Sequence, residues 1–157
     1  MKNIFFPERD ISFDDIKFVC YMIERTARNI KQPNAYVVDH IGKEELNRNL
    51  SLADVLHCES PDDVSDRWIV EYQLERGTTD VLDIDKTLTP NPPTAIQMGK
   101  VYARLIQTTL LSQENIGDRI SKVYHSPISQ KLDNYNCSAY YEPSDFIARA
   151  YYQGDFN

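Results

Sequence analysis

The feature that most constrains the fold is a series of helix start signals, each followed by apolar residues at three- and four-residue spacing. The clearest is Ser60-Pro61-Asp62-Asp63, with an N-cap serine, a proline at the first helical position and two acids in the first turn. Ser12 and Ser126 introduce further helices, and no segment has a convincing strand pattern. The sequence therefore predicts an all-α fold, a multi-helix bundle of about seven or eight helices.

The helix boundaries follow from caps and breakers. The first helix, over residues 13–31, has Glu24 among its polar positions. Pro33 is predicted to occupy the first position of the second helix, and Gly42 to end it. Gly77 is predicted to end the helix that begins after Ser60, and Ser112 to cap the helix near residue 116.

Residues 78–93 are predicted to form an irregular connector, because Pro90, Pro92 and Pro93 disfavour helix in the residues before them. The connector divides the chain into two helical lobes, residues 1–77 and 94–157. A chain of 157 residues is long enough to bury a sizeable core in this arrangement.

Charge and cysteine content limit the classes of partner. The net charge of −7 lies entirely in residues 1–90, which hold 11 Lys and Arg against 18 Asp and Glu. Because no basic stripe is present, nucleic acid is not expected as a ligand. The sequence has no apolar run of membrane-spanning length and no N-terminal secretion signal, so no membrane partner is expected. Three widely spaced cysteines, without a Cys-x-x-Cys pair, favour reduced thiols and a cytoplasmic location, with no metal site and no cofactor.

The acidic excess is concentrated between residues 54 and 85, where ten acids accompany two arginines. We expect Asp62, Asp63 and Asp66 to lie on the exposed face of one helix. Such a face can steer a basic protein partner to its docking site. The alternative is a face that only keeps the protein soluble.

One short run has a chemical motif. Val81-Leu82-Asp83-Ile84-Asp85-Lys86-Thr87 resembles the Asp-x-Asp-x-Thr motif of haloacid-dehalogenase-like phosphatases, in which the first Asp is the nucleophile and the second the acid and base. That chemistry needs a buried strand before the motif and further strands after it, and neither is predicted here. A solvated acidic connector is therefore the preferred interpretation, and a diverged phosphatase that uses Asp83 and Asp85 is the alternative.

Two further groups have open interpretations. His57, Cys58 and Glu59 are consecutive, so on a helix they point about 100° apart and cannot converge on one atom. A structural role is preferred, with Cys58 packed as a small hydrophobic residue, and a Cys–His hydrolase pair stays open. The C-terminal tyrosines, expected at the rim of the core or on a binding face, are Tyr135, Tyr140, Tyr141, Tyr151 and Tyr152.

The first half of the chain resembles a short all-helical bacterial family of unknown function. The resemblance covers about residues 13–75 and rests on the helix that begins Ile16-Lys17-Phe18-Val19, on Leu56-His57-Cys58-Glu59 and on Asp62-Asp63-Val64. It implies an all-helical fold and a bacterial source. Members of that family are often found beside ADP-ribosyltransferase-like proteins, which implies an antitoxin-like or partner-regulating role.

These observations together predict a non-enzymatic protein–protein interaction module. Its partner is expected to be a basic or amphipathic protein that docks on the acidic first lobe. A structural homodimer is a further alternative. Trp68 is expected to be buried, because it shares a helix face with Val64 and Tyr72.

Overall fold

The computed structural model describes residues 3–6 and 9–156. Within these residues the chain forms eight α-helices and one 3₁₀ helix and no strand, which confirms the all-α prediction. The elements in chain order are α1 (Phe13–Ile30), α2 (Asn34–Ser51), α3 (Ala53–Leu56), α4 (Pro61–Glu71), α5 (Ala95–Thr109), α6 (Ile116–Tyr124), α7 (Pro127–Leu132), η1 (Ala139–Tyr141) and α8 (Ser144–Gln153).

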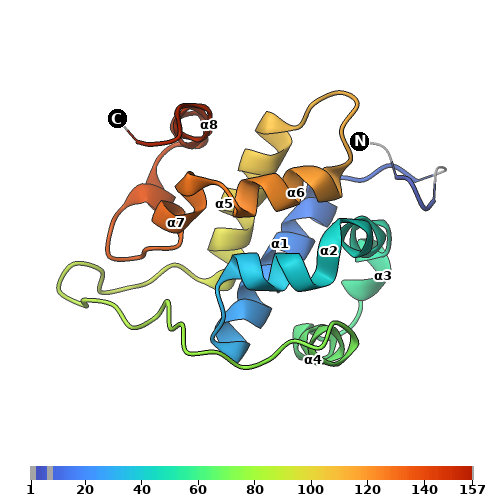
Figure 1. Ribbon diagram of the computed structural model, residues 1–157, viewed down its shortest axis with the longest axis horizontal. Helices are drawn as coiled ribbons and strands as arrows, with labels where there is room; N and C mark the ends of the chain where they lie inside the picture. The colour runs from blue at the N-terminus through green and yellow to red at the C-terminus, as the bar shows by residue number, and fades with distance from the viewer. Residues whose placement is uncertain (1–2, 7–8, 157) are drawn as a thin grey trace.

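Four helices enclose the centre of the molecule (Figure 1). α1 packs most extensively on α5, and α2 on α6, while α1 also contacts α2 and α5 contacts α6. α4 lies against α1, α8 lies against α5, and α7 contacts α6, α8 and η1. Because helices from both sides of the connector contribute to this ring, the described residues before and after the connector share one hydrophobic core.

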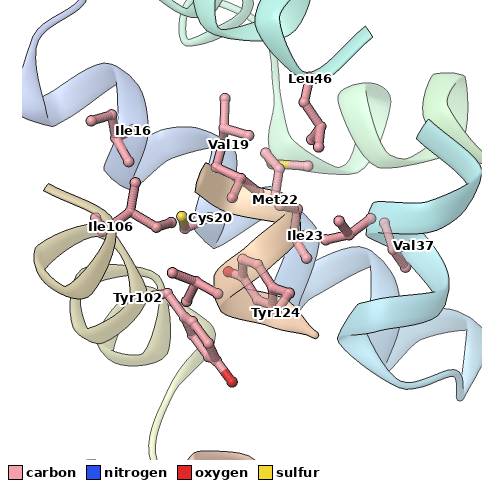
Figure 2. Close-up of a cluster of buried hydrophobic side chains, with 14 of the residues drawn as sticks. Ile16, Val19, Cys20, Met22, Ile23, Val37, Leu46, Tyr102, Ile106 and Tyr124 are labelled. Carbon is pink, nitrogen blue, oxygen red and sulfur yellow. The ribbon is translucent and has the colours of Figure 1, made fainter. Parts of the chain in front are cut away.

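The core is built on α1, whose side chains Val19, Met22 and Ile23 are fully buried (Figure 2). The rings of Tyr102 and Tyr124, from α5 and α6, stack with centroids 4.1 Å apart. Close-packed apolar groups of this kind contribute most of the free energy of folding in a helical domain.

Trp68 is only 1% exposed, and the prediction that it is buried is therefore confirmed. Its Nε1 donates a hydrogen bond of 3.1 Å to Oδ1 of Asn49, which satisfies the buried indole N–H.

Local capping accounts for several helix starts. Ser12 Oγ accepts from the backbone N–H of Asp15, while the Asp15 carboxylate accepts from the N–H of Ser12 at 2.8 Å. Ser60 Oγ accepts from the N–H of Asp63, as predicted, with Pro61 at the first helical position. Each cap satisfies N–H groups that a helix start otherwise leaves unpaired.

Four predicted boundaries differ from the structure. Pro33 is the N-cap of α2, so the helix begins one residue later, at Asn34. Gly42 does interrupt the helix with a positive φ of 81°, but helical structure resumes directly after it and α2 continues. Asn115, in place of Ser112, is the N-cap residue of α6.

The fourth difference concerns Gly77, because α4 ends at Glu71 and Gly77 lies beyond it. Its N–H donates to the carbonyl of Ile30 at 2.8 Å, which joins the connector to the end of α1. A Cβ at this position would lie 2.6 Å from the carbonyl oxygen of Lys31. Glycine is therefore required by the close approach of two chain segments, not by a helix end.

Candidate functional site

The three predicted acids lie on the first two turns of α4, and all are exposed. The carboxylate of Asp62 pairs with Arg25 of α1 at 2.5 Å. Asp66 lines a shallow hollow between α1 and α4, together with Arg25 and Ser65. The structure thus brings two of the acids next to a basic residue of the core helix.

The exposed face of α4 also has an apolar residue. Asp63, Asp66 and Val70 follow at helical spacing, and Val70 is 78% exposed. An exposed aliphatic side chain beside carboxylates is a surface that can contact both the stem and the charge of a lysine or arginine.

Asp83 and Asp85 lie in the connector, in a segment of turns without a strand, and both are exposed. Asp85 accepts hydrogen bonds from the hydroxyl of Thr87 at 2.6 Å and from its N–H at 2.9 Å. The Thr87 hydroxyl, followed by the Thr87 N–H, lowers the pKa of Asp85 below its ordinary value. The strand that the phosphatase motif requires before its first aspartate is therefore not formed here.

His57, Cys58 and Glu59 do not converge. The ring of His57 packs on Phe18 with centroids 4.8 Å apart, and Glu59 pairs with Arg67 at 2.6 Å. Cys58 is exposed, so the prediction that it packs as a small hydrophobic residue is wrong. Over the described ranges 3–6 and 9–156, no group of three or more His, Cys, Asp or Glu side chains is arranged to hold a metal ion.

A second site lies elsewhere, around Glu24 of α1. This carboxylate is 1% exposed, and it accepts from Arg28 Nε at 2.9 Å, from the hydroxyl of Tyr135 at 3.0 Å and from Asn34 Nδ2 at 3.1 Å. Three donors, one of them cationic, compensate the loss of water around a buried charge.

Asp133 follows α7 and is the second carboxylate of this cluster. Its Oδ1 accepts from the Tyr102 hydroxyl at 2.6 Å, and its Oδ2 accepts from Asn34 Nδ2 at 3.2 Å. Burial, followed by the negative charge of Glu24, raises the pKa of Asp133 to about 8. Asp133 is therefore mostly protonated at neutral pH, while Glu24 is paired with Arg28.

Asn34 connects the two carboxylates from the first position of α2. Its Nδ2 donates to both Glu24 and Asp133. Its Oδ1 is buried and has no hydrogen-bond partner within the described chain. A buried amide oxygen without a donor is uncommon and unfavourable, so this part of the cluster is not saturated by the protein.

Glu24, Asn34 and Asp133 line one wall of a cavity of about 660 Å³, called here the Asp133 cavity. It is lined by residues from the end of α1 and the start of α2 (24–35), from the connector (79–82) and from α6, α7 and the turn that follows (124–134). Its volume lies within the range of small-molecule sites, roughly 300–1,000 Å³. In Figure 1 the connector runs along one edge of the molecule, between α4 and α5.

The charges at the cavity are mostly paired with one another. Lys31 and Asp80 form a pair at 3.2 Å, and Arg28 pairs with Glu24 at 2.9 Å. Among the ion pairs of the described residues, none includes Asp133. The cavity therefore has one carboxyl group, Asp133, that neutral donors hold and that forms no ion pair with a described residue.

Sequence reasoning missed this cluster, although one signal was present. Glu24 follows Cys20 by four residues and precedes Ala27 by three, so it belongs to the apolar stripe of α1 and not to its polar side. The assignment of Glu24 to a polar position was therefore wrong. Tyr135 is 1% exposed, which agrees with the core interpretation of this tyrosine.

Comparisons with known proteins add no relative. No family model matches the chain, and neither the curated proteins nor the solved structures gave a significant match. No helix in the part of the chain that the structure describes has the length and apolar character to cross a membrane.

Proposed function

We propose that this chain is a non-enzymatic binding module whose ligand site is the Asp133 cavity. The observation that carries the proposal is Asp133 itself, a carboxyl group without a cationic partner among the described ion pairs, in the wall of a cavity of small-molecule size. A large pocket that combines convergent polar groups with a perturbed carboxyl pKa is the preferred location for a binding site.

Two observations favour binding over catalysis. The carboxylate of Glu24 already accepts three hydrogen bonds, so it serves to hold Arg28 and Asn34 in place. Burial raises the pKa of the Cys20 thiol to about 12, so this thiol is protonated and is not a nucleophile.

The test is a titration of the ¹⁵N-labelled protein with cationic, neutral and anionic fragments. Ala35→Phe reduces the space in the cavity, and Ile96→Phe places the same ring on the exposed side of α5 as a matched control. We expect fragments to shift the amide signals of residues 31–35 and 124–134 in the wild type and in Ile96→Phe, but not in Ala35→Phe. A library that leaves these signals unchanged contradicts the proposal.

The second candidate function is docking of a basic protein partner on the exposed face of α4. The exposure of Val70 beside Asp63 and Asp66 supports it. The resemblance over residues 13–75 supports a bacterial setting, beside an ADP-ribosyltransferase-like protein, and the three widely spaced cysteines support a cytoplasmic location. A homodimer through the same face is the alternative outcome.

A capture experiment from a bacterial lysate, followed by association kinetics with the purified partner, tests this candidate. Electrostatic docking predicts an on-rate that falls with salt, because the screening length is about 8 Å at physiological ionic strength. Replacing Asp62, Asp63 and Asp66 with Asn should lower the on-rate more than it raises the off-rate. Thermal unfolding of the triple variant is the control, since two of these acids lie in the first turn of α4.

A further inference from the structure

We propose that the ligand of the Asp133 cavity is a small organic cation, with an ammonium or guanidinium group that binds Asp133 and displaces its proton to solvent. This inference rests on the proposed function, since it specifies what the same cavity binds. It adds the ligand's charge, its hydrogen-bonding character and the proton that leaves.

The charge of the ligand follows from the pairing of the groups that surround the cavity. Arg28 is held by Glu24, and Lys31 is held by Asp80. An anionic ligand would have to compete with these carboxylates for its cation. A cationic ligand meets Asp133, whose partners are the neutral donors Tyr102 and Asn34. Opposite charge within about 4–6 Å favours the ionised carboxylate, so ligand and ionisation stabilise each other.

The hydrogen-bonding character of the ligand follows from the same wall. Carboxylate oxygens accept only, and ammonium and guanidinium groups donate only, so their hydrogen-bonding capacities are complementary. A planar guanidinium can donate to both oxygens of one carboxylate. The carbon part of the ligand has apolar neighbours as well, because Ala27, Val81 and Leu82 also line the cavity.

The titratable groups that face Asp133 show which of them loses a proton when the cation binds. These are Glu24 and Arg28 from α1, Tyr102 from α5 and Tyr135 from the turn after α7. The rim of the cavity adds Lys31, Asp80 and His125. Burial raises the pKa of Tyr102 and of Tyr135 above the ordinary value, so both phenols stay protonated near neutral pH. Asp133 is the group that changes charge when a cation arrives, and its proton passes to the buffer.

The experiment measures the dissociation constants of n-butylguanidinium and n-butylammonium between pH 6 and 9, from amide chemical shifts of the full chain. n-Butanol and butyrate, of similar size, are the neutral and anionic comparison probes. We expect the cations to bind most tightly, and their affinity to rise about tenfold per pH unit up to pH 8 and to level off above it. In Asp133→Asn the affinity should fall at least tenfold and lose its pH dependence.

Asp83→Asn removes an exposed carboxylate of the connector and serves as the matched control, with affinity and pH dependence like those of the wild type. Binding of n-butanol or butyrate in preference to the cations would overturn the inference but leave the proposed function standing. So would cation binding that does not depend on pH. If no probe binds, the result contradicts both the organic-cation inference and the proposed function.

Two sources can supply this ligand chemistry, a free metabolite amine or the lysine or arginine side chain of a protein partner. A peptide of Gly and Ser with one central arginine, and the same peptide with glutamine in its place, distinguish them. Tighter binding of the arginine peptide than of n-butylguanidinium identifies a protein side chain, and weaker binding identifies a small molecule. The organic-cation class holds in either case.

Discussion

The hydroxyl of Tyr135 lies 3.0 Å from Oε2 of Glu24, although 111 residues separate them in the chain. Glu24 belongs to the first helix, and Tyr135 to the turn that follows α7. Arg28 Nη2 also donates to the Tyr135 hydroxyl at 3.0 Å and to the carbonyl of Pro93 at 2.9 Å. The buried carboxylate of Glu24 therefore joins the first helix to the turn after α7 directly, and to the connector through Arg28. The same carboxylate lines the Asp133 cavity.

The first prediction concerns Glu24→Ala. The substitution leaves the partly buried Arg28 without its carboxylate and removes an acceptor from Tyr135 and Asn34. Breaking a buried ion pair in this way costs about 3–5 kcal/mol of unfolding free energy. Urea denaturation followed by circular dichroism measures it.

Asp62→Asn is the matched control for Glu24→Ala, because it breaks the exposed pair between Arg25 and Asp62. Exposed pairs contribute about 0–1 kcal/mol, so the change should be small. Equal losses of unfolding free energy in Glu24→Ala and Asp62→Asn would mean that burial does not make the Glu24 ion pair more stabilising than an exposed one.

The second prediction concerns the pH dependence of stability. Because the pKa of Asp133 is raised on folding, the folded state binds more protons than the unfolded state between about pH 4 and pH 8. This contribution to stability is therefore fully present below pH 4, falls as pH rises and is lost above pH 8. The slope reaches at most about 1.4 kcal/mol per pH unit for one group.

In Asp133→Asn, the asparagine side chain has nearly the shape of the protonated carboxyl group but does not titrate. The stability of the variant relative to the wild type should therefore increase from pH 5 to pH 8. Unfolding free energies at four pH values between these limits measure the trend. Parallel curves for the two proteins would show that Asp133 has similar proton affinity in both states.

The parts of the fold that sequence predicted are those with local causes. Ser60 and Pro61 act within one or two turns of the chain, so their effects can be read from neighbouring residues. Trp68 was predicted to be buried from the periodicity of its own helix. Gly77 was misassigned because the group that approaches it, the carbonyl of Lys31, is 46 positions earlier in the sequence.

The Asp133 cavity could be predicted far less well, for the same reason. Glu24, Asn34 and Asp133 come from three separate segments, and Asn34 and Asp133 each have an ordinary surface interpretation when taken alone. What makes them a site is their hydrogen bonding to one another and to Tyr102 and Tyr135, which lie on α5 and in the turn after α7. Helical spacing identifies Glu24 as unusual, but it does not identify the partners that keep the carboxylate buried.

The third prediction compares two residues of α4. Trp68→Ala removes a fully buried indole and the hydrogen bond to Asn49, which costs about 3–5 kcal/mol. Val70→Ala, two residues away and 78% exposed, should change stability by no more than about 0.5 kcal/mol. Thermal unfolding of both variants measures the difference. Native fluorescence of the wild type should have the short-wavelength maximum of a buried indole, and a maximum typical of solvent-exposed tryptophan would contradict it.

The last prediction concerns Asp83, the first aspartate of the phosphatase-like motif. It is exposed in a segment of turns, and its N–H donates to the carbonyl of Asp80 at 3.1 Å, so the backbone and not the side chain fixes the turn. Asp83→Asn should therefore change the unfolding free energy by no more than about 0.5 kcal/mol. A phosphatase would need this carboxylate as its nucleophile, with magnesium to neutralise the phosphate. We expect no turnover of p-nitrophenyl phosphate by the wild type with magnesium present. Turnover that disappears in Asp83→Asn would instead assign catalysis to the connector.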